Sequence, residues 1–316
     1  MAVSATMALT SCGGGGNTTK YASGSVTLAC DASFRNIMEQ EIQVFEYKYP
    51  QTSVLDRYMT ENEAMDSLIA GNVKMAVTTR PLDKKEIAYL KSQDRMVSQE
   101  AIAVDAIALI VNPENPMDEI DHQDIVDILT GKYTSWDKIV PHDGQLKDIS
   151  VVFDGNGSST VRYMRDSLLN GAMFGPNVFA QKSPDDVFRV VSKNINAIGV
   201  IGVSWITTDM KAREMTAEEM TRVAERDDTT STSFSSAIKV LAVQPEGKLK
   251  AYLPYQLNIY NGDYPFYRQV YLISTSSPHS VGASFFSFVT SAVGQKIILT
   301  TGVCPKMIHA QFVSLD

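Results

Sequence analysis

The chain has 316 residues, of which 44% are hydrophobic and 20% are charged, and its formal net charge is −8. This composition is typical of a globular protein that is large enough for two domain-sized cores. The acidic balance argues against a nucleic-acid partner, because the sequence offers no basic stripe. No apolar run reaches the roughly 20 residues that a membrane-spanning helix needs.

The N-terminal 23 residues have the pattern of a leader and a tether. An apolar stretch over 1–9 is followed by Thr10, Ser11 and Cys12, and then by four glycines. This resembles the lipobox of bacterial lipoproteins, in which the cysteine is lipidated. The basic start of a secretory signal is missing, so either the start is truncated or the likeness is accidental. We expect truncation, with lipid attachment at Cys12, a flexible tether up to residue 23 and a location on the periplasmic or cell-surface side of the membrane.

Strands and helices alternate along the rest of the chain. We expect strands at 26–30, 53–58, 74–78, 102–111, 149–153 and 197–203, and helices at 36–47, 62–70, 84–92, 121–129 and 160–169, with a helix cap at Ser183 and a surface loop over 226–236. This alternation predicts an α/β fold with mainly parallel sheets.

A hydroxyl-rich turn lies between the strand at 149–153 and the helix that follows it. Ser158, Ser159 and Thr160 offer hydroxyl donors, and Arg162 offers a guanidinium. Free N–H groups at such a turn can hold a phosphate-like oxyanion without a metal. The same residues would also suit an ordinary helix cap, so this turn alone does not decide between the two.

Three loops in the first half of the chain are candidate companions of this turn. Ser33 and Phe34 follow the first strand, Thr60 follows the second, and Thr79 and Arg80 follow the third. Ligands of open α/β sheets bind at the carboxyl ends of strands, so we expect these residues to face the turn, with Arg80 presenting its guanidinium to the anion. Helix capping, or a surface salt bridge for Arg80, is the alternative at each position.

Four segments occur in an order that is typical of one protein family. They cover residues 105–116, 128–136, 264–271 and 291–305. In this order they resemble the phosphate-binding protein of the bacterial phosphate ABC importer, within the type II periplasmic-binding superfamily. The resemblance implies a two-lobed fold with a hinge and an interdomain ligand cleft. We expect one lobe from 24–104 plus 272–316 and the other from 105–271, with crossing strands near 103–110 and 269–274.

The resemblance also implies the function and the binding residues. It predicts a monomer that captures inorganic phosphate for separate ABC permease subunits, is held at the membrane by its lipid anchor, and uses no metal or other cofactor. The family's ligand loops fall on the hydroxyl-rich turn and on the three loops of the first half of the chain. Arg162 and Asp105 are further candidates from this sequence. The expected ligand residues are Ser33, Phe34, Thr60, Thr79, Arg80, Asp105, Ser158, Ser159, Thr160 and Arg162.

One departure from the family concerns selectivity. The third loop carries Thr79 and Arg80 where well-known members have an aspartate, which accepts the phosphate proton and repels sulfate. Glu63 and Asp105 are the candidate substitutes. Sulfate, molybdate or tungstate therefore stays open as the ligand, and so does a sensor or adhesion role.

A phosphatase-like enzyme is the least favoured alternative. The four histidines are scattered along the chain, and no metal-binding spacing or nucleophile with a base is present. Cys30 and Cys304 could pair in an oxidising compartment, and the sequence leaves that open.

Overall fold

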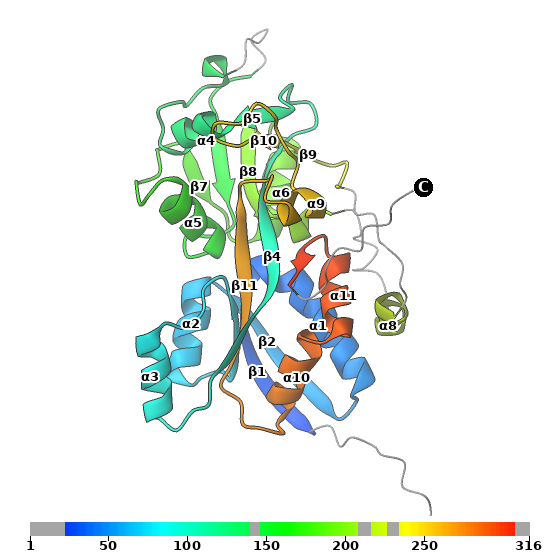
Figure 1. The fold of residues 1–316 in the computed structure, drawn as a ribbon. Helices are drawn as coiled ribbons and strands as arrows, with labels where there is room; N and C mark the ends of the chain where they lie inside the picture. Colours follow the sequence, from blue (N-terminus) through cyan, green and yellow to red (C-terminus); the bar gives the residue numbers. More distant parts are fainter. Residues whose placement is uncertain (1–22, 140–145, 208–215, 226–233, 307–316) are drawn as a thin grey trace, which may run out of the picture.

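The computed structural model describes residues 23–139, 146–207, 216–225 and 234–306 (Figure 1). Cys12, the glycine tether and most of the expected loop at 226–236 therefore lie outside the described residues. Ten strands form one sheet, whose main path runs β2-β1-β3-β11-β4-β8-β6-β7, with β9 and β12 also pairing with β4. The strands of this sheet are β1 Gly24–Asp31, β2 Thr52–Met59, β3 Met75–Thr78, β4 Ser98–Val111, β6 Ser150–Phe153, β7 Val178–Ala180, β8 Ala197–Gly202, β9 Lys239–Val240, β11 Tyr267–Ser274 and β12 Cys304–Pro305.

Figure 1 shows two parts joined by β4 and β11. We call the part around β1, β2 and β3 the first lobe and the part around β6, β7 and β8 the second lobe. Strand β4 pairs with β11 over Ser98–Ala106 and with β8 over Ile107–Val111, so it belongs to both. The outer strands of each lobe are parallel, whereas β4 and β11 pair in the antiparallel sense. The sheet is therefore mixed rather than mainly parallel.

Helices cover both lobes, and most of them begin at residues that satisfy their free N–H groups. The α-helices are α1 Arg35–Lys48, α2 Glu61–Ala70, α3 Lys84–Ser92, α4 His122–Leu129, α5 Ser159–Tyr163, α6 Pro184–Lys193, α8 Ala217–Glu225, α9 Gln256–Tyr260, α10 Val281–Val289 and α11 Ala292–Thr300. A small second sheet pairs β5 Glu119–Asp121 with β10 Ala242–Gln244. Ser183 caps α6 as expected.

The helix expected at 160–169 differs from the expectation in kind. Its α-helical part ends at Tyr163 and passes into a π-helix over Met164–Leu168, where Leu169 N donates to the carbonyl of Met164 at 3.0 Å. Such wide turns interrupt an α-helix locally and are frequent beside functional sites.

The main apolar core runs through both lobes. In the first lobe, Phe45 of α1 packs against Phe285 and Phe288 of α10, with ring centroids 5.1 and 5.4 Å apart. Cys30 and Cys304 are both buried, and both are free thiols. In the described part of the chain, no single helix is long and apolar enough to cross a membrane, and the bent pair of α10 and α11 meets that test by length and composition only.

The core of the first lobe contains a buried carboxyl group that has no hydrogen-bond partner among the described residues. Glu41 of α1 is fully buried, and both of its carboxyl oxygens lack a hydrogen-bond partner among the described residues. Burial in this setting raises the pKa of Glu41 well above its ordinary value. An unpaired carboxylate is costly to bury, so folding favours the protonated form.

Glu41 therefore makes stability depend on pH. Because its folded pKa lies above its unfolded pKa, its favourable contribution is complete below about pH 4.5 and is lost as the pH rises from there. We expect Glu41→Gln to be more stable than the wild type at pH 8 by about 1–3 kcal/mol, and the difference to vanish near pH 4.5. Urea unfolding across this range measures it, with the exposed Glu114→Gln as the control. A pH-independent difference would contradict this account.

Candidate functional site

The expected hydroxyl turn is folded around a carboxylate that follows β6. Ser158 Oγ donates to Asp154 Oδ1 at 2.6 Å, and Thr160 Oγ1 donates to Asp154 Oδ2 at 3.3 Å. From the first lobe, Ser33 Oγ donates to the same Oδ2 atom at 2.8 Å. All four residues are buried. Three hydroxyls from two lobes thus converge on one carboxylate. We call the donor residues Ser33, Ser158 and Thr160, together with Ser159, the cradle.

A second carboxylate, Asp31 at the end of β1, joins the lobes beside the cradle. Its Oδ1 accepts from Ser33 N at 3.0 Å, and its Oδ2 accepts from Ser159 N at 3.2 Å. Burial raises the pKa of Asp31 to about 6, although Arg268 opposes the shift. Asp31 therefore lies where its carboxylate can accept a further hydrogen bond from an O–H group of a ligand.

The cation of the site is Arg268 of β11. Its Nη2 lies 3.0 Å from Asp105 Oδ2, and the two residues face each other in the register of β11 and β4. Its Nη1 donates to Ser159 Oγ at 2.8 Å and to Thr160 Oγ1 at 3.0 Å. The guanidinium lies 5.0 Å from the centre of the Phe34 ring. Burial raises the pKa of Asp105 to about 6, and Arg268 opposes that rise.

Arg162 makes another link between the lobes. It extends to the first lobe, where its Nε lies 2.5 Å from Glu61 Oε2, and it also donates to Thr79 Oγ1. Thr79 N and Thr79 Oγ1 donate to Glu61 Oε1 at 2.6 and 2.7 Å. Burial acts to raise the pKa of Glu61, but these donors hold it below its ordinary value. The guanidinium of Arg162 is therefore already paired with a carboxylate.

Three other expected residues have local partners. Arg80 forms two hydrogen bonds to Glu86, both of 2.8 Å, so its guanidinium is used in the first turn of α3 and not in the cradle. Glu63 and Thr60 form the reciprocal cap of α2. Glu63 is therefore placed as a capping residue, and of the two candidate acceptors only Asp105 reaches the cradle's cation.

A family profile described as "PBP superfamily domain" matches residues 15–293. The chain belongs to this superfamily. The phosphate-binding protein PstS of Pseudomonas aeruginosa is 20% identical over 297 residues, which covers 90% of this chain and 83% of that protein. PstS 2 of Streptococcus agalactiae is 29% identical over 117 residues, which covers 37% of this chain and 38% of that protein.

Solved structures agree on the PBP-superfamily fold. One is a putative phosphate ABC transporter substrate-binding protein from Clostridium perfringens with bound phosphate, with a TM-score of 0.69, 21% identity and coverage of 89% of this chain and 99% of that chain. Another is an ABC-type phosphate transport receptor from Vibrio cholerae, with a TM-score of 0.61, 20% identity and coverage of 89% and 100%. At these identities the likeness establishes the two-lobed fold.

Within this fold, the sequence interpretation missed Asp31, Glu61, Asp154 and Arg268. Asp154 and Asp31 stand shortly before the expected ligand residues, but the interpretation of those two loops rested on the residues that follow each aspartate, and the substitute acceptor was sought at Glu63 and Asp105. Arg268 lies in the segment 264–271, which carried the family resemblance. Its position opposite Asp105 follows from the register of β11 and β4, which the sequence does not reveal. Glu61 lay in the expected loop after the second strand, just before the helix expected at 62–70, and was not proposed as a site residue; in the structure it begins α2.

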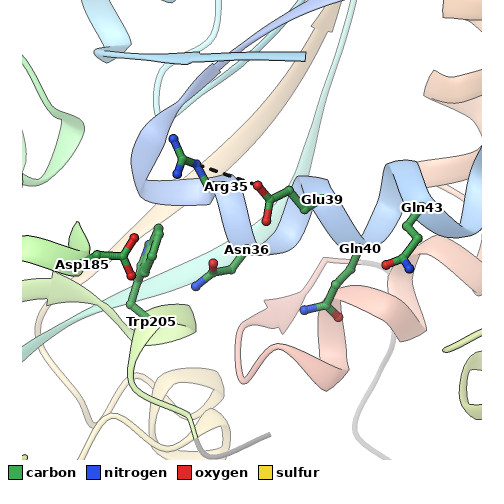
Figure 2. Close-up of a pocket in the computed structure, with 7 residues that line it drawn as sticks. All are labelled: Arg35, Asn36, Glu39, Gln40, Gln43, Asp185 and Trp205. Atoms are coloured by element: carbon green, nitrogen blue, oxygen red, sulfur yellow. Dashed lines mark ion pairs between the residues drawn. The ribbon is translucent and has the colours of Figure 1, made fainter. Parts of the chain in front are cut away.

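A separate pocket opens between α1 and the second lobe (Figure 2). It has a volume of about 240 Å³ and is lined by polar groups that include Arg35 and Glu39 of α1, Asp185 of α6 and Trp205. Among the described residues that line it, none belongs to the cradle. It lies next to the cradle's supports, because Trp205 Nε1 donates to the carbonyl of Ser33 at 2.8 Å. In the same described ranges, no group of three or more His, Cys, Asp or Glu residues is arranged to hold a metal ion.

Gly157 of the second lobe lies against Thr60 of the first lobe. A Cβ added at Gly157 would lie 3.1 Å from Thr60 Cβ, whereas one added at Gly155 would meet nothing within 4 Å. We expect Gly157→Ala to disfavour the closed form by about 1–3 kcal/mol, as overpacking does elsewhere. Small-angle X-ray scattering should show a larger radius of gyration for Gly157→Ala and no change for Gly155→Ala. Equal radii for the two variants would contradict the closed packing.

Proposed function

We propose that the protein is an extracytoplasmic binding protein that captures inorganic phosphate between its lobes for an ABC importer. The observation that carries this is the convergence of Ser33, Ser158 and Thr160 on a single oxyanion, the Asp154 carboxylate. Hydroxyl donors arranged around carboxylate oxygens suit the oxygens of a tetrahedral anion equally well. The relatives named phosphate-binding protein, and the fold shared with a phosphate-bound structure, support phosphate as that anion.

Hinge motion about β4 and β11 would open and close this site. We take one lobe as 24–104 plus 272–316 and the other as 105–271. Closure excludes water from the anion and presents a distinct surface to a permease, which would be a separate protein. The protein would act as a monomer.

Binding is the role that the relatives support, because they are named as phosphate-binding proteins. A hydrolase would need a base beside one of the hydroxyls, and among the described residues the carboxylate of Asp154 is the group in that position, whereas His122 packs on Phe266. A phosphatase-like enzyme therefore stays the less favoured alternative. Another oxyanion is the alternative ligand, and selectivity measurements separate it from phosphate.

We assign the selectivity role to Asp31, in place of Glu63 and Asp105. Asp31 is buried between the two lobes and accepts hydrogen bonds from cradle residues of both, whereas Asp105 bonds to Arg268 through Oδ2, and its Oδ1 has no hydrogen-bond partner among the described residues. A buried carboxylate accepts a hydrogen bond from the O–H group of hydrogen phosphate but repels sulfate, which has no such proton, and such like-charge contacts cost several kcal/mol.

The wild type should therefore bind phosphate and reject sulfate and molybdate. Asp31→Asn keeps the shape and loses the charge, so the ratio of phosphate to sulfate affinity should fall at least about tenfold, equivalent to about 1.4 kcal/mol. Calorimetric titrations with the three anions measure this, and Glu63→Gln should leave the ratio unchanged. A wild type that prefers sulfate or molybdate would refute phosphate as the ligand. An unchanged ratio in Asp31→Asn would refute the role of Asp31 alone.

Attachment at the membrane through Cys12 belongs to the same proposal. It is supported by the sequence Leu9-Thr10-Ser11-Cys12 and the glycines after it. Mass spectrometry of the protein from its native membrane fraction should find an N-terminal Cys12 that carries acyl chains, and Cys12→Ser should release the protein from that fraction. An unmodified chain that starts upstream of Cys12 would contradict lipidation.

A further inference from the structure

The carboxylate of Asp154 occupies the donors that a captured anion would need. It accepts from Ser33 Oγ, Ser158 Oγ and Thr160 Oγ1, and its residue is only 6% exposed. None of the ion pairs in the described part of the chain involves Asp154. Its charge is therefore stabilised by the cradle hydroxyls, in the way that a bound anion would be.

Each of these hydroxyls has one proton to donate. A hydroxyl that donates to Asp154 cannot donate to a ligand oxygen at the same time, so a phosphate ion and the Asp154 carboxylate compete for the same donors. We propose that Asp154 is an internal competitor that fills the cradle in the ligand-free protein and lowers the affinity for the captured anion. This inference rests on the proposed function for its ligand.

The same carboxylate holds the two lobes together without a ligand. The bond from Ser33 Oγ to Asp154 Oδ2 crosses from the first lobe to the second, beside the crossing bond from Ser159 N to Asp31. Two more bonds cross nearby, from Trp205 Nε1 to the carbonyl of Ser33 and from Asn36 Nδ2 to the carbonyl of Ser204. Loss of the Asp154 carboxylate would remove one of these crossing bonds, the one that a cradle hydroxyl donates, and it should favour the open form.

The charges around the cradle strengthen the competition. Asp31 and Asp105 are buried close by, and Arg268 is the cation that faces them. With Asp154 these are three carboxylates around one guanidinium. An incoming anion must displace Asp154 from its donors and also enter a region with an excess of buried acidic groups. Removing the carboxylate of Asp154 lowers both barriers, whereas removing Asp31 or Asp105 would leave the donors occupied.

Two measurements on the full chain test the proposal. In calorimetric titration with inorganic phosphate, Asp154→Asn and Asp154→Ala should bind at least tenfold more tightly than the wild type. In small-angle X-ray scattering without phosphate, Asp154→Ala should have a larger radius of gyration than the wild type. The exposed Asp148→Asn, which precedes the same strand, is the matched control and should change neither quantity.

The outcomes separate this inference from the proposed function. Unchanged or weaker phosphate binding in both Asp154 variants would overturn the inference, because the carboxylate would then assist the ligand or be irrelevant to it. If neither the wild type nor the variants bind phosphate, the proposed function fails, and the scattering measurement still decides whether Asp154 closes the cleft: an unchanged radius overturns that role. Should Asp154→Ala not fold, Ser33→Ala removes the same crossing bond from the other lobe and takes its place in scattering.

Discussion

The organisation of the cleft depends on the buried ion pair between the guanidinium of Arg268 and the carboxylate of Asp105. A buried charge is stable only when it is paired and its donors are satisfied. Asp105 supplies the pairing across β4 and β11, and Ser159 and Thr160 accept from the remaining nitrogen. The hydroxyl turn of the second lobe is thus oriented from the strands that join the lobes. The aromatic face of Phe34 covers the cation from the first lobe.

The electrostatics of the cleft are the reverse of a simple positive pocket. Burial raises the pKa of both Asp31 and Asp105 to about 6, so both are mainly ionised at neutral pH. Arg162 and Arg268, the two arginines of the site, are each paired with a carboxylate, Glu61 and Asp105 respectively. An anion in this cleft would therefore be held by directed hydrogen bonds rather than by net charge, which makes the position of each hydroxyl decisive.

The sequence predicted local features well and long-range ones poorly. The helices have strong end signals, such as the reciprocal cap of Thr60 and Glu63, and their positions followed from them. Arg80 was expected at the ligand because it stands between a strand end and a proline. Glu86 lies six residues further on, and its carboxylate accepts two hydrogen bonds from the guanidinium of Arg80, which is therefore paired locally and not with a ligand. The pairing of Arg268 with Asp105 spans 163 positions and follows from strand register, which no local pattern reveals.

The register of β4 and β11 also explains how one site can serve both an open and a closed molecule. Asp105 lies just before the point where β4 passes from β11 to β8, and the register of the two strands shifts nearby, where Ile102 is an extra residue on β4 between the partners of Val270 and Tyr271. In the proposed hinge motion, residues paired across this ladder would keep their separation, so Arg268 would stay on Asp105. Bonds between loop ends, such as Ser33 to Asp154, span the cleft and must break when it opens. The Arg268–Asp105 ion pair lies on the two strands that join the lobes, whereas the hydroxyl contacts lie farther from them. This difference in distance from the strands separates the contact that would stay from the contacts that would break.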